Sequence, residues 1–344
     1  MKTYSVRGRL VGACYGVMCC IVMALGLTTS AAWGKNYLQH PQFQQFLGEM
    51  EQAHHWDRMD LIALFSEVDQ RDDIIALMER PAEKTKTWSE YRPIFINETS
   101  VKRGLAFWAE HEDVLAQAAQ TYRVPAEIMV AIIGVETRYG NFKGKFPVIE
   151  ALSTLAFSYP PRSAFFRNEL EQFLVLNKAR VLSPNVLGSY AGAMGYPQFI
   201  PSSYRQFAVD FDRDGKVDLI NSVDDAVGSV GNYFHRHGWQ AERVVVRPLS
   251  LRAGVKEADI AVQANRQLEP TWRAQDMRVL GLDGVDEVPG KTPVTLLRYE
   301  TDQGPEYWAG FENFYVITRY NRSRLYAMAV YQLAETLRAS RKVG

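Results

Sequence analysis

The chain has 344 residues, of which 47% are hydrophobic and 12% are aromatic. Its 39 basic residues balance its 39 acidic residues, so the formal net charge is zero. This composition excludes a low-complexity chain and offers no basic stripe for nucleic acid. We therefore expect a folded protein with room for two or three compact units and without a nucleic-acid partner.

The first 35 residues differ from everything that follows. Basic residues lie at the start, and an uncharged run extends from residue 10 to residue 34. The run ends in the small residues Thr29-Ser30-Ala31-Ala32, which offer a cleavage site. We predict a signal peptide over residues 1–32 and export to the periplasm. The alternative is an uncleaved anchor, for which the run is long enough and which would leave the protein membrane-associated.

All three cysteines, Cys14, Cys19 and Cys20, lie inside this leader. A lipoprotein needs its cysteine just after the apolar stretch, and these cysteines come too early, so we expect no lipidation. The mature chain would then have no thiol and no disulfide. Its stability must come from a hydrophobic core, with a bound metal as an open additional source.

Residues 39–181 have a helical pattern. Phe43, Phe46, Leu47 and Met50 have the spacing of one apolar helix face. A second amphipathic segment has its apolar positions at Leu105, Trp108, Ala109, Val114, Leu115 and Ala118. Val124-Pro125-Ala126-Glu127 then begins a strongly apolar helix, with proline in the first turn and an acid near the positive end.

After Trp239 the pattern changes to short β-rich runs. These runs are Val244-Val245-Val246, Val294-Thr295-Leu296-Leu297 and Tyr315-Val316-Ile317-Thr318. They predict a small β-rich unit over residues 241–321. A final helix is expected from Ser323 to Arg341, and its apolar residues that would pack onto earlier helices are Tyr326, Met328, Ala329 and Leu333.

Glu136 ends the apolar run Ile128 to Val135. Apolar surroundings and the negative end of a helix both disfavour a carboxylate, so we expect a raised pKa for Glu136. A general acid for glycosidic cleavage needs this property. From position alone, an ion pair with Arg138 or another cation at the helix end is the favoured interpretation.

Several motifs occur in a fixed order around this acid. They are Gly134-Val135-Glu136-Thr137-Arg138-Tyr139-Gly140, Ala151-Leu152-Ser153-Thr154-Leu155, Gly188-Ser189-Tyr190-Ala191-Gly192-Ala193-Met194-Gly195, Pro197-Gln198-Phe199-Ile200-Pro201-Ser202-Ser203-Tyr204, Ala226-Val227-Gly228-Ser229-Val230-Gly231-Asn232-Tyr233-Phe234 and Phe314-Tyr315-Val316-Ile317-Thr318-Arg319-Tyr320-Asn321. The set resembles the B-type lytic murein transglycosylases over roughly residues 36–340. The resemblance implies an α+β, mainly α-helical fold with a core similar to goose-type lysozyme. It divides the chain into a helical domain (33–120 plus 322–344), the catalytic core (121–240) and an inserted β-rich domain (241–321).

The resemblance places Glu136 at the catalytic position. It implies cleavage between N-acetylmuramic acid and N-acetylglucosamine, with the substrate's own C6 hydroxyl in place of water, so that no second carboxylate is required. Positions that match the groove of the family are Ser189, Gln198, Tyr233, Asn321, Tyr326 and Arg162. Ser189 and Gln198 are alternatively braces of a Gly-rich loop, and Tyr233 a core aromatic. Phe165 departs from the family pattern, which has a tyrosine there, and is left out of the site.

Asp210, Asp212 and Asp214, followed by Gly215, match the first half of a calcium loop. The usual closing acid at position 12 is replaced by Asn221. By the family resemblance, Asp224 closes a lengthened loop over residues 210–224, and Lys216 supplies its backbone carbonyl. Asp218 would contribute directly or through water. We expect one structural calcium and no organic cofactor; the alternative is an acidic turn that binds sodium or nothing.

The sequence therefore predicts a monomeric, exported enzyme whose partner is the peptidoglycan glycan strand. Other cell-wall enzymes remain open as partners. Two alternatives stay open as well: a hydrolytic lysozyme-like muramidase, and a non-catalytic, calcium-stabilised peptidoglycan-binding or scaffold protein.

Overall fold

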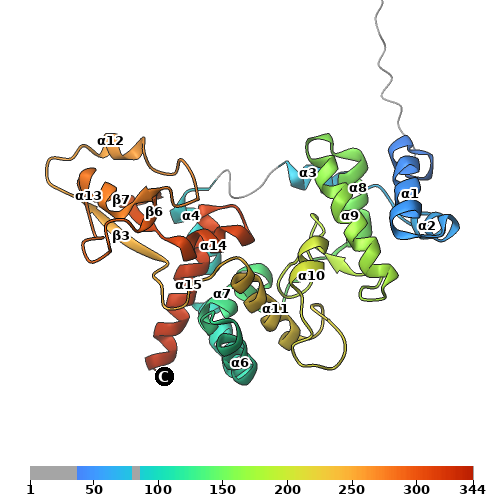
Figure 1. Cartoon of the computed structure of the whole chain (residues 1–344), viewed down its shortest axis with the longest axis horizontal. Helices are drawn as coiled ribbons and strands as arrows, with labels where there is room; N and C mark the ends of the chain where they lie inside the picture. Colours follow the sequence, from blue (N-terminus) through green and yellow to red (C-terminus); the bar gives the residue numbers. More distant parts are fainter. Residues whose placement is uncertain (1–36, 80–85, 344) are drawn as a thin grey trace, which may run out of the picture. The chain divides into compact units, whose positions relative to one another are not determined.

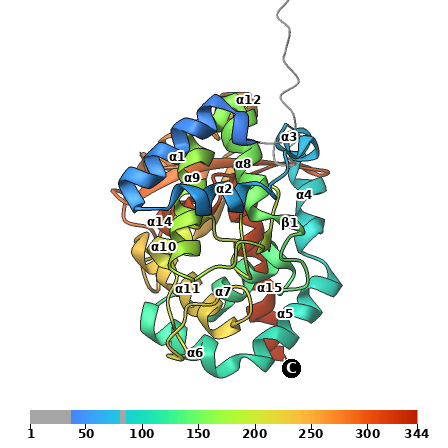
Figure 2. The same ribbon diagram turned by 90° about the vertical axis from the view of Figure 1, so that its right-hand side faces the viewer.

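The computed structural model describes residues 37–79 and 86–343, all within one compact unit, Lys35–Gly344. The predicted signal peptide and its three cysteines lie outside the described residues. Within those ranges no helix combines the length and the apolar character that a membrane crossing requires. Figures 1 and 2 show the arrangement of the elements.

The elements in chain order are η1 (Tyr37–Gln39), α1 (Pro41–His54), α2 (Arg58–Phe65), α3 (Asp72–Met78), α4 (Trp88–Phe95), α5 (Glu98–Glu110), α6 (Glu112–Tyr122), α7 (Ala126–Thr137), β1 (Phe146–Pro147), α8 (Val148–Ser158), η3 (Pro160–Arg162), α9 (Ser163–Lys178), β2 (Leu187–Gly188), α10 (Pro201–Phe207), α11 (Val223–Arg236), β3 (Val246–Leu251), α12 (Glu257–Ala261), β4 (Trp272–Arg273), α13 (Ala274–Val279), β5 (Leu282–Asp283), β6 (Pro293–Thr301), β7 (Gly304–Gly310), α14 (Glu312–Tyr320) and α15 (Arg324–Val343), with η1 and η3 being 3₁₀-helices. Helices predominate, which confirms the expected mainly helical α+β class.

Helix α1 has the apolar face that its spacing predicts, because Phe43, Phe46, Leu47 and Met50 are all buried. Proline at its first position suits a turn whose N–H groups have no partner inside the helix. The second predicted amphipathic segment is two helices, α5 and α6, which meet at His111. Trp108 is buried there, whereas Ala109 is exposed.

Helix α7 is the central helix of the larger core. Every residue from Ile128 to Gly134 is buried, and the helix packs against α5, α6, α11 and α15. A fully buried aliphatic side chain contributes about 1.5–3 kcal/mol to burial free energy, so this helix is held mainly by its apolar surface. It ends where Arg138 adopts a left-handed conformation with φ of 51°.

Helix α15 lies alongside α7 although the two are far apart in the sequence (Figure 1). The residues predicted to pack onto earlier helices, Tyr326, Met328, Ala329 and Leu333, are buried. This confirms the predicted role of the last helix, and it brings residue 326 beside the end of α7.

The β-rich segment is an antiparallel five-stranded sheet in the order β4-β6-β7-β3-β5. A tight hairpin joins β6 to β7, with Thr301 paired to Gly304. The sheet and the short helices α12 and α13 share a second hydrophobic core that includes Leu249, Met277 and Leu296. This core is separate from the larger core that contains α7.

One strand prediction is wrong. Tyr315–Thr318 lies inside α14, and the last strand ends at Gly310. Four β-branched or aromatic residues in a row favour a strand by propensity, but Phe314 and Ile317 are spaced to bury one helix face together against the core. Tertiary packing on α15 and β7 decides the conformation here. The boundaries of the three proposed domains stay a prediction.

Candidate functional site

Glu136 is the next-to-last residue of α7 and is half-buried. The hydroxyl of Tyr326, 190 residues away on α15, donates a hydrogen bond of 2.5 Å to Glu136 Oε1. Tyr326 is buried, and burial together with the nearby negative charge of Glu136 raises its pKa well above the usual range. Tyr326 therefore remains a neutral donor, and it fixes one oxygen of the carboxyl group.

Tyr320, the last residue of α14, lies beside this pair. The rings of Tyr320 and Tyr326 are called the aromatic wall below. Its ring stacks on that of Tyr326 with an interplanar angle of 13°, and its hydroxyl donates to the carbonyl of Pro197 at 2.6 Å. Burial first, and the charge of Glu136 second, raise its pKa well above the usual range. No sequence pattern singled out Tyr320, although it directly precedes Asn321 in the segment 314–321.

Ser189 and Gln198 hold the Gly-rich loop, residues 188–195. The hydroxyl oxygen of Ser189 accepts from the backbone N–H groups of Ala191 and Ala193. The side-chain amide of Gln198 donates to the carbonyl of Gly195 at 2.9 Å and to that of Lys143 at 3.2 Å. These contacts match the bracing role that the sequence left open.

The loop also needs glycine at Gly195. Its φ is 71°, and a Cβ there would lie 2.2 Å from the carbonyl oxygen of Leu219. Any other residue would have to displace that backbone, so the close approach of the loop to the segment before α11 depends on glycine.

Tyr233 is buried within α11. Its hydroxyl donates to the carbonyl of Arg319 at 2.6 Å, and its ring stacks on His237 at a centroid distance of 4.0 Å. It also meets the ring of Tyr320 in a T-shaped contact at 4.8 Å. Tyr233 thus supports the aromatic wall from behind.

Arg162 and Asn321 both line one cavity of about 750 Å³. Its other lining residues include Tyr190 from the Gly-rich loop and the segment 265–268 from the β-rich unit. The guanidinium of Arg162 lies over the ring of Phe165 at 4.4 Å, so the phenylalanine that departs from the family pattern supports the arginine. Asn321 is the C-cap of α14, and the cavity lining continues along the chain to Leu325, the residue before Tyr326.

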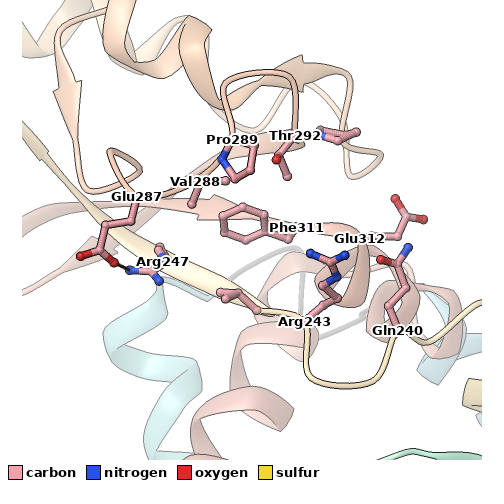
Figure 3. A pocket seen from close by; sticks show the side chains of 11 residues that line it. Gln240, Arg243, Arg247, Glu287, Val288, Pro289, Thr292, Phe311 and Glu312 are labelled. Carbon is pink, nitrogen blue, oxygen red and sulfur yellow. Dashed lines mark ion pairs between the residues drawn. The ribbon is translucent and has the colours of Figure 1, made fainter.

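A second cavity, of about 420 Å³, lies at the base of the β-rich unit (Figure 3). Its walls include Phe311, Arg243 and the ion pair between Arg247 and Glu287 at 3.6 Å. None of the predicted site residues lines it, so it is not part of the candidate active site.

Asp210, Asp212 and Asp214 converge as the calcium motif predicts. One carboxylate oxygen of each lies within 4.8 Å of the others. Asp210 Oδ1 is buried without a hydrogen-bond donor, and an uncompensated buried acceptor costs about 1–3 kcal/mol. Three close carboxylates and a buried oxygen without a donor fit a hard cation such as calcium.

The remaining predicted ligands are Lys216 and Asp224. The backbone N–H of Lys216 donates to Asp214 Oδ1 at 2.8 Å. Asp224 lies in the first turn of α11. The helix's N-cap, Ser222, donates to Asp212 Oδ2 at 3.2 Å. Among the described residues, the carboxylate cluster does not include Asp224.

Asp218 and Asp225 brace the loop from inside. Asp218 accepts hydrogen bonds from the backbone of Ile220 and Asn221. Asp225 accepts from the backbone N–H groups of Phe211 and Asp218, each at 2.7 Å, and burial raises the pKa of its carboxyl. No sequence pattern singled out Asp225, because nothing in an acidic helix start distinguishes the buried acid from its half-buried neighbour Asp224.

A half-buried acid at the end of an apolar helix, hydrogen-bonded to a buried tyrosine, suits a lysozyme-like glycan-cleaving enzyme. The chain belongs to the family described as "Transglycosylase SLT domain", whose model matches residues 38–335. It is therefore a member of the lytic murein transglycosylases.

Three comparisons support this assignment. The chain is 40% identical over 325 residues to the membrane-bound lytic murein transglycosylase B of Escherichia coli K12, covering 90% of this chain and 86% of that protein. It matches the catenated lytic transglycosylase SltB1 of Pseudomonas aeruginosa with a TM-score of 0.84 and 45% identity, over 89% of this chain and all of that one. It also matches the structure of the Escherichia coli lytic transglycosylase Slt35 in complex with calcium. The TM-score is 0.81 and the identity 39%, over 90% of this chain and 96% of that one.

Proposed function

We propose that this chain cleaves the β-1,4 bond between N-acetylmuramic acid and N-acetylglucosamine in peptidoglycan without water, with Glu136 as the single acid and base. The observation that carries the proposal is the hydrogen bond from Tyr326 to Glu136 Oε1 in a half-buried setting. It orients one carboxyl group and supplies a donor that stays neutral. No second acid lies beside Glu136 in the sequence, and this reaction does not need one.

The reaction balances with one carboxyl group. Glu136 gives its proton to the glycosidic oxygen as the bond from that oxygen to C1 breaks. The C6 hydroxyl of the same muramic acid forms a bond to C1 and returns its proton to Glu136. The products are a 1,6-anhydro ring and a free hydroxyl group, and the enzyme regains its starting protonation. Tyr326 stabilises the carboxylate between the two steps through its hydrogen bond.

The groove residues would act on the sugar around this centre. Arg162 and Asn321 offer donors and an amide oxygen at the cavity, which suits acetamido and hydroxyl groups. Ser189, Gln198 and Tyr233 would act chiefly by holding the loop and the wall against which the glycan rests. Their bonds to the protein backbone support this division of roles.

Digestion of purified sacculi is expected to yield muropeptides with 1,6-anhydro ends, each lighter by one water than a hydrolysed product. Mass spectrometry of the released fragments checks this. Ordinary reducing ends would show that water attacks and that the chain is a muramidase. Absence of any released product, from a protein that still binds sacculi, would favour the non-catalytic binding module.

For the acidic loop, we propose one structural calcium held by Asp210, Asp212 and Asp214, the carbonyl of Lys216 and the carboxyl of Asp224. The buried, donor-less oxygen of Asp210 supports the site. The ion would neutralise the mutual repulsion of the carboxylates and tie the loop to the start of α11. It takes no part in the proton transfers.

Removal of calcium with a chelator is expected to lower the melting temperature, because the folded state alone binds the ion. At a free calcium concentration of 100 times Kd the stabilisation is about 2.7 kcal/mol. Differential scanning calorimetry with a chelator, and after calcium is added back, measures the shift. Asp214→Asn should abolish the response, whereas Asp259→Asn, an exposed acid on α12, should keep it. An identical melting curve with and without calcium would contradict the site.

We further propose export to the periplasm by the leader, residues 1–32, and action on peptidoglycan there as a monomer. The family assignment supports this location, since the substrate of these enzymes is the cell wall.

A further inference from the structure

A further cavity, of about 500 Å³, lies where the β6–β7 hairpin meets α4 and α15. It shares no lining residue with the cavity of about 750 Å³, and none of the predicted site residues lines it. Its volume falls within the range of about 300–1,000 Å³ that is typical of small-ligand sites. The cavity is therefore a candidate binding site separate from the Glu136 site.

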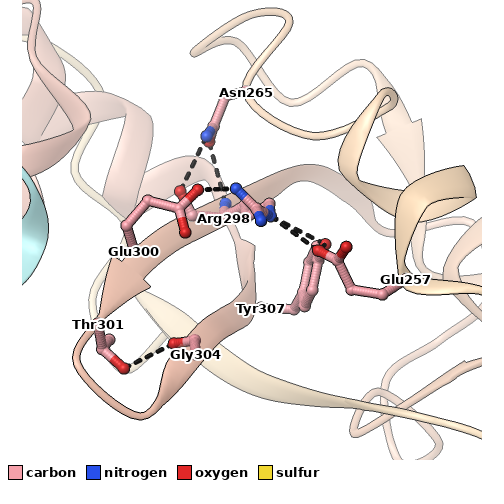
Figure 4. Close-up of polar contacts among 7 residues, drawn as sticks. All are labelled: Glu257, Asn265, Arg298, Glu300, Thr301, Gly304 and Tyr307. Carbon is pink, nitrogen blue, oxygen red and sulfur yellow. Dashed lines mark hydrogen bonds and ion pairs between the residues drawn. The ribbon is translucent and has the colours of Figure 1, made fainter.

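The hairpin tip, which forms one wall of this cavity, is held in place. The hydroxyl of Thr301 donates to the carbonyl of Gly304 at 2.6 Å and closes the turn (Figure 4). The backbone N–H of Asp302 donates to the hydroxyl oxygen of Ser89 on α4 at 2.9 Å. Because these bonds fix the wall in the free protein, a ligand that binds there has little ordering to impose.

Free donors and acceptors line this cavity. Asp302 and Gln303 are exposed, and neither side chain has a partner among the residues that the structure describes. Arg92 uses only its Nε within that part of the chain, donating to Gln332 Oε1 of α15 at 2.8 Å, so its terminal nitrogens stay available. A carboxylate, an amide and a guanidinium together can accept from and donate to hydroxyl groups.

Two tryptophans add apolar surface to the lining. Trp88 is buried and packs on Tyr299, with the ring centroids 5.3 Å apart. Trp308 is partly exposed, and its Nε1 donates to Glu306 Oε2 at 3.3 Å. Aromatic surface beside hydrogen-bonding groups suits a sugar ring, because the faces of the ring are apolar and its rim carries hydroxyls.

The charges of the lining argue against a charged ligand. The carboxylates of Asp302 and Glu306 outnumber the single guanidinium, that of Arg92, so an anion is disfavoured. Among the described residues, neither acid belongs to a cluster that could hold a metal ion. The lining fits an uncharged, hydroxylated ligand best.

We propose that this cavity is a second, non-catalytic glycan-binding site, which takes N-acetylglucosamine rings of peptidoglycan outside the groove of Glu136. N-acetylglucosamine is uncharged, and its hydroxyl and acetamido groups match the free donors and acceptors. The inference rests on the proposed function only in taking peptidoglycan as the polymer, and it holds whichever group attacks the glycosidic bond. A second contact keeps the enzyme on an insoluble polymer, since a linked site rebinds at a high effective concentration.

The test uses Glu136→Gln as background, so that no cleavage occurs. Asp302→Ala combined with Gln303→Ala should weaken binding to purified sacculi, measured by co-sedimentation, about 5-fold or more. Arg92→Ala, on another element, should act in the same direction. In calorimetry, a tetramer of N-acetylglucosamine should occupy the groove and this cavity in the background protein, and the groove alone in the double variant.

The matched control is Asp259→Ala combined with Gln275→Ala. These are an exposed acid of α12 and an exposed amide of α13 outside this cavity, and their loss should change neither measurement. With native Glu136, the protein altered at 302 and 303 should cleave soluble tetrasaccharide fragments at the wild-type rate. Melting temperatures reveal a folding defect, and if the double variant has one, Arg92→Ala decides.

Unchanged binding to sacculi in these variants, or a tetramer that binds at one site in every protein, would overturn the inference. Slower cleavage of the soluble fragments by the protein altered at 302 and 303 would overturn it as well, because those residues would then belong to the catalytic groove. Failure of the proposed function shows up elsewhere, as missing anhydro products from the unaltered chain.

Discussion

Replacement of Glu136 by glutamine is expected to reduce release of anhydromuropeptides by about 10²–10⁴-fold or more. The amide has the same shape and still offers an oxygen to Tyr326, so the hydrogen bond at 2.5 Å has an acceptor. It has no acidic proton for the glycosidic oxygen and no basic oxygen for the C6 hydroxyl. Both halves of the reaction fail through one substitution.

The measurement is the rate of product release from sacculi by wild type and variant at equal concentration. The matched control is Glu127→Gln on the same helix, where the acid lies in the first turn and 3.9 Å from Arg338. That change should leave the rate near wild type and the stability within about 0.5 kcal/mol. A Glu136→Gln protein that retains wild-type turnover would refute the proposed role of Glu136.

Replacement of Gly134 by alanine is expected to destabilise the protein by about 1–3 kcal/mol and to lower its activity. A Cβ at Gly134 would lie 2.6 Å from the ring of Tyr139. That ring lies between α7 and α5, since its hydroxyl packs so closely on Gly104 of α5 that a Cβ built there would lie 2.5 Å from it. The added methyl group must push α7 away from its neighbours two residues before Glu136.

The control is Gly48→Ala, in the interior of α1, where an added Cβ meets nothing within 4 Å. Alanine there should stabilise the fold by about 0.4–1 kcal/mol, because it restricts the unfolded chain. Chemical denaturation of both variants gives the two free energies, and sacculus digestion gives the activities. The free energy of unfolding is expected to fall in Gly134→Ala and to rise in Gly48→Ala. If the Gly134→Ala protein were as stable as the Gly48→Ala protein, the added methyl group would fit between α7 and α5. That result would contradict the prediction.

The pairing of Tyr326 with Glu136 explains why the last helix matters for a site that begins near the middle of the chain. The carboxyl group of Glu136 is half-buried in the folded protein. Helix α15, which packs along α7, brings its hydrogen-bond donor Tyr326 from the other end of the sequence. Variants that loosen α15 should therefore reduce activity before they unfold the rest.

Local patterns in the sequence were sufficient for the elements that bury a regular face. The spacing of Phe43 and Met50 predicted α1, and the apolar run before Glu136 predicted α7. The alternate acids from Asp210 to Asp214 predicted a cluster that the fold does assemble. These patterns succeed because 3.6-residue periodicity and turn chemistry act between near neighbours.

The sequence by itself thus determined the main helices, the presence of a β-rich insertion, the acidic loop and the acid at the end of α7. Only the tertiary structure decided that residues 315–318 form a helix, that Tyr320 and Tyr326 wall the acid, and that α4, α15 and the β6–β7 hairpin share one cavity. The reason is physical. Propensity and periodicity are local, whereas burial, the partner of a carboxyl group and the lining of a cavity depend on which distant segments the folded core brings together.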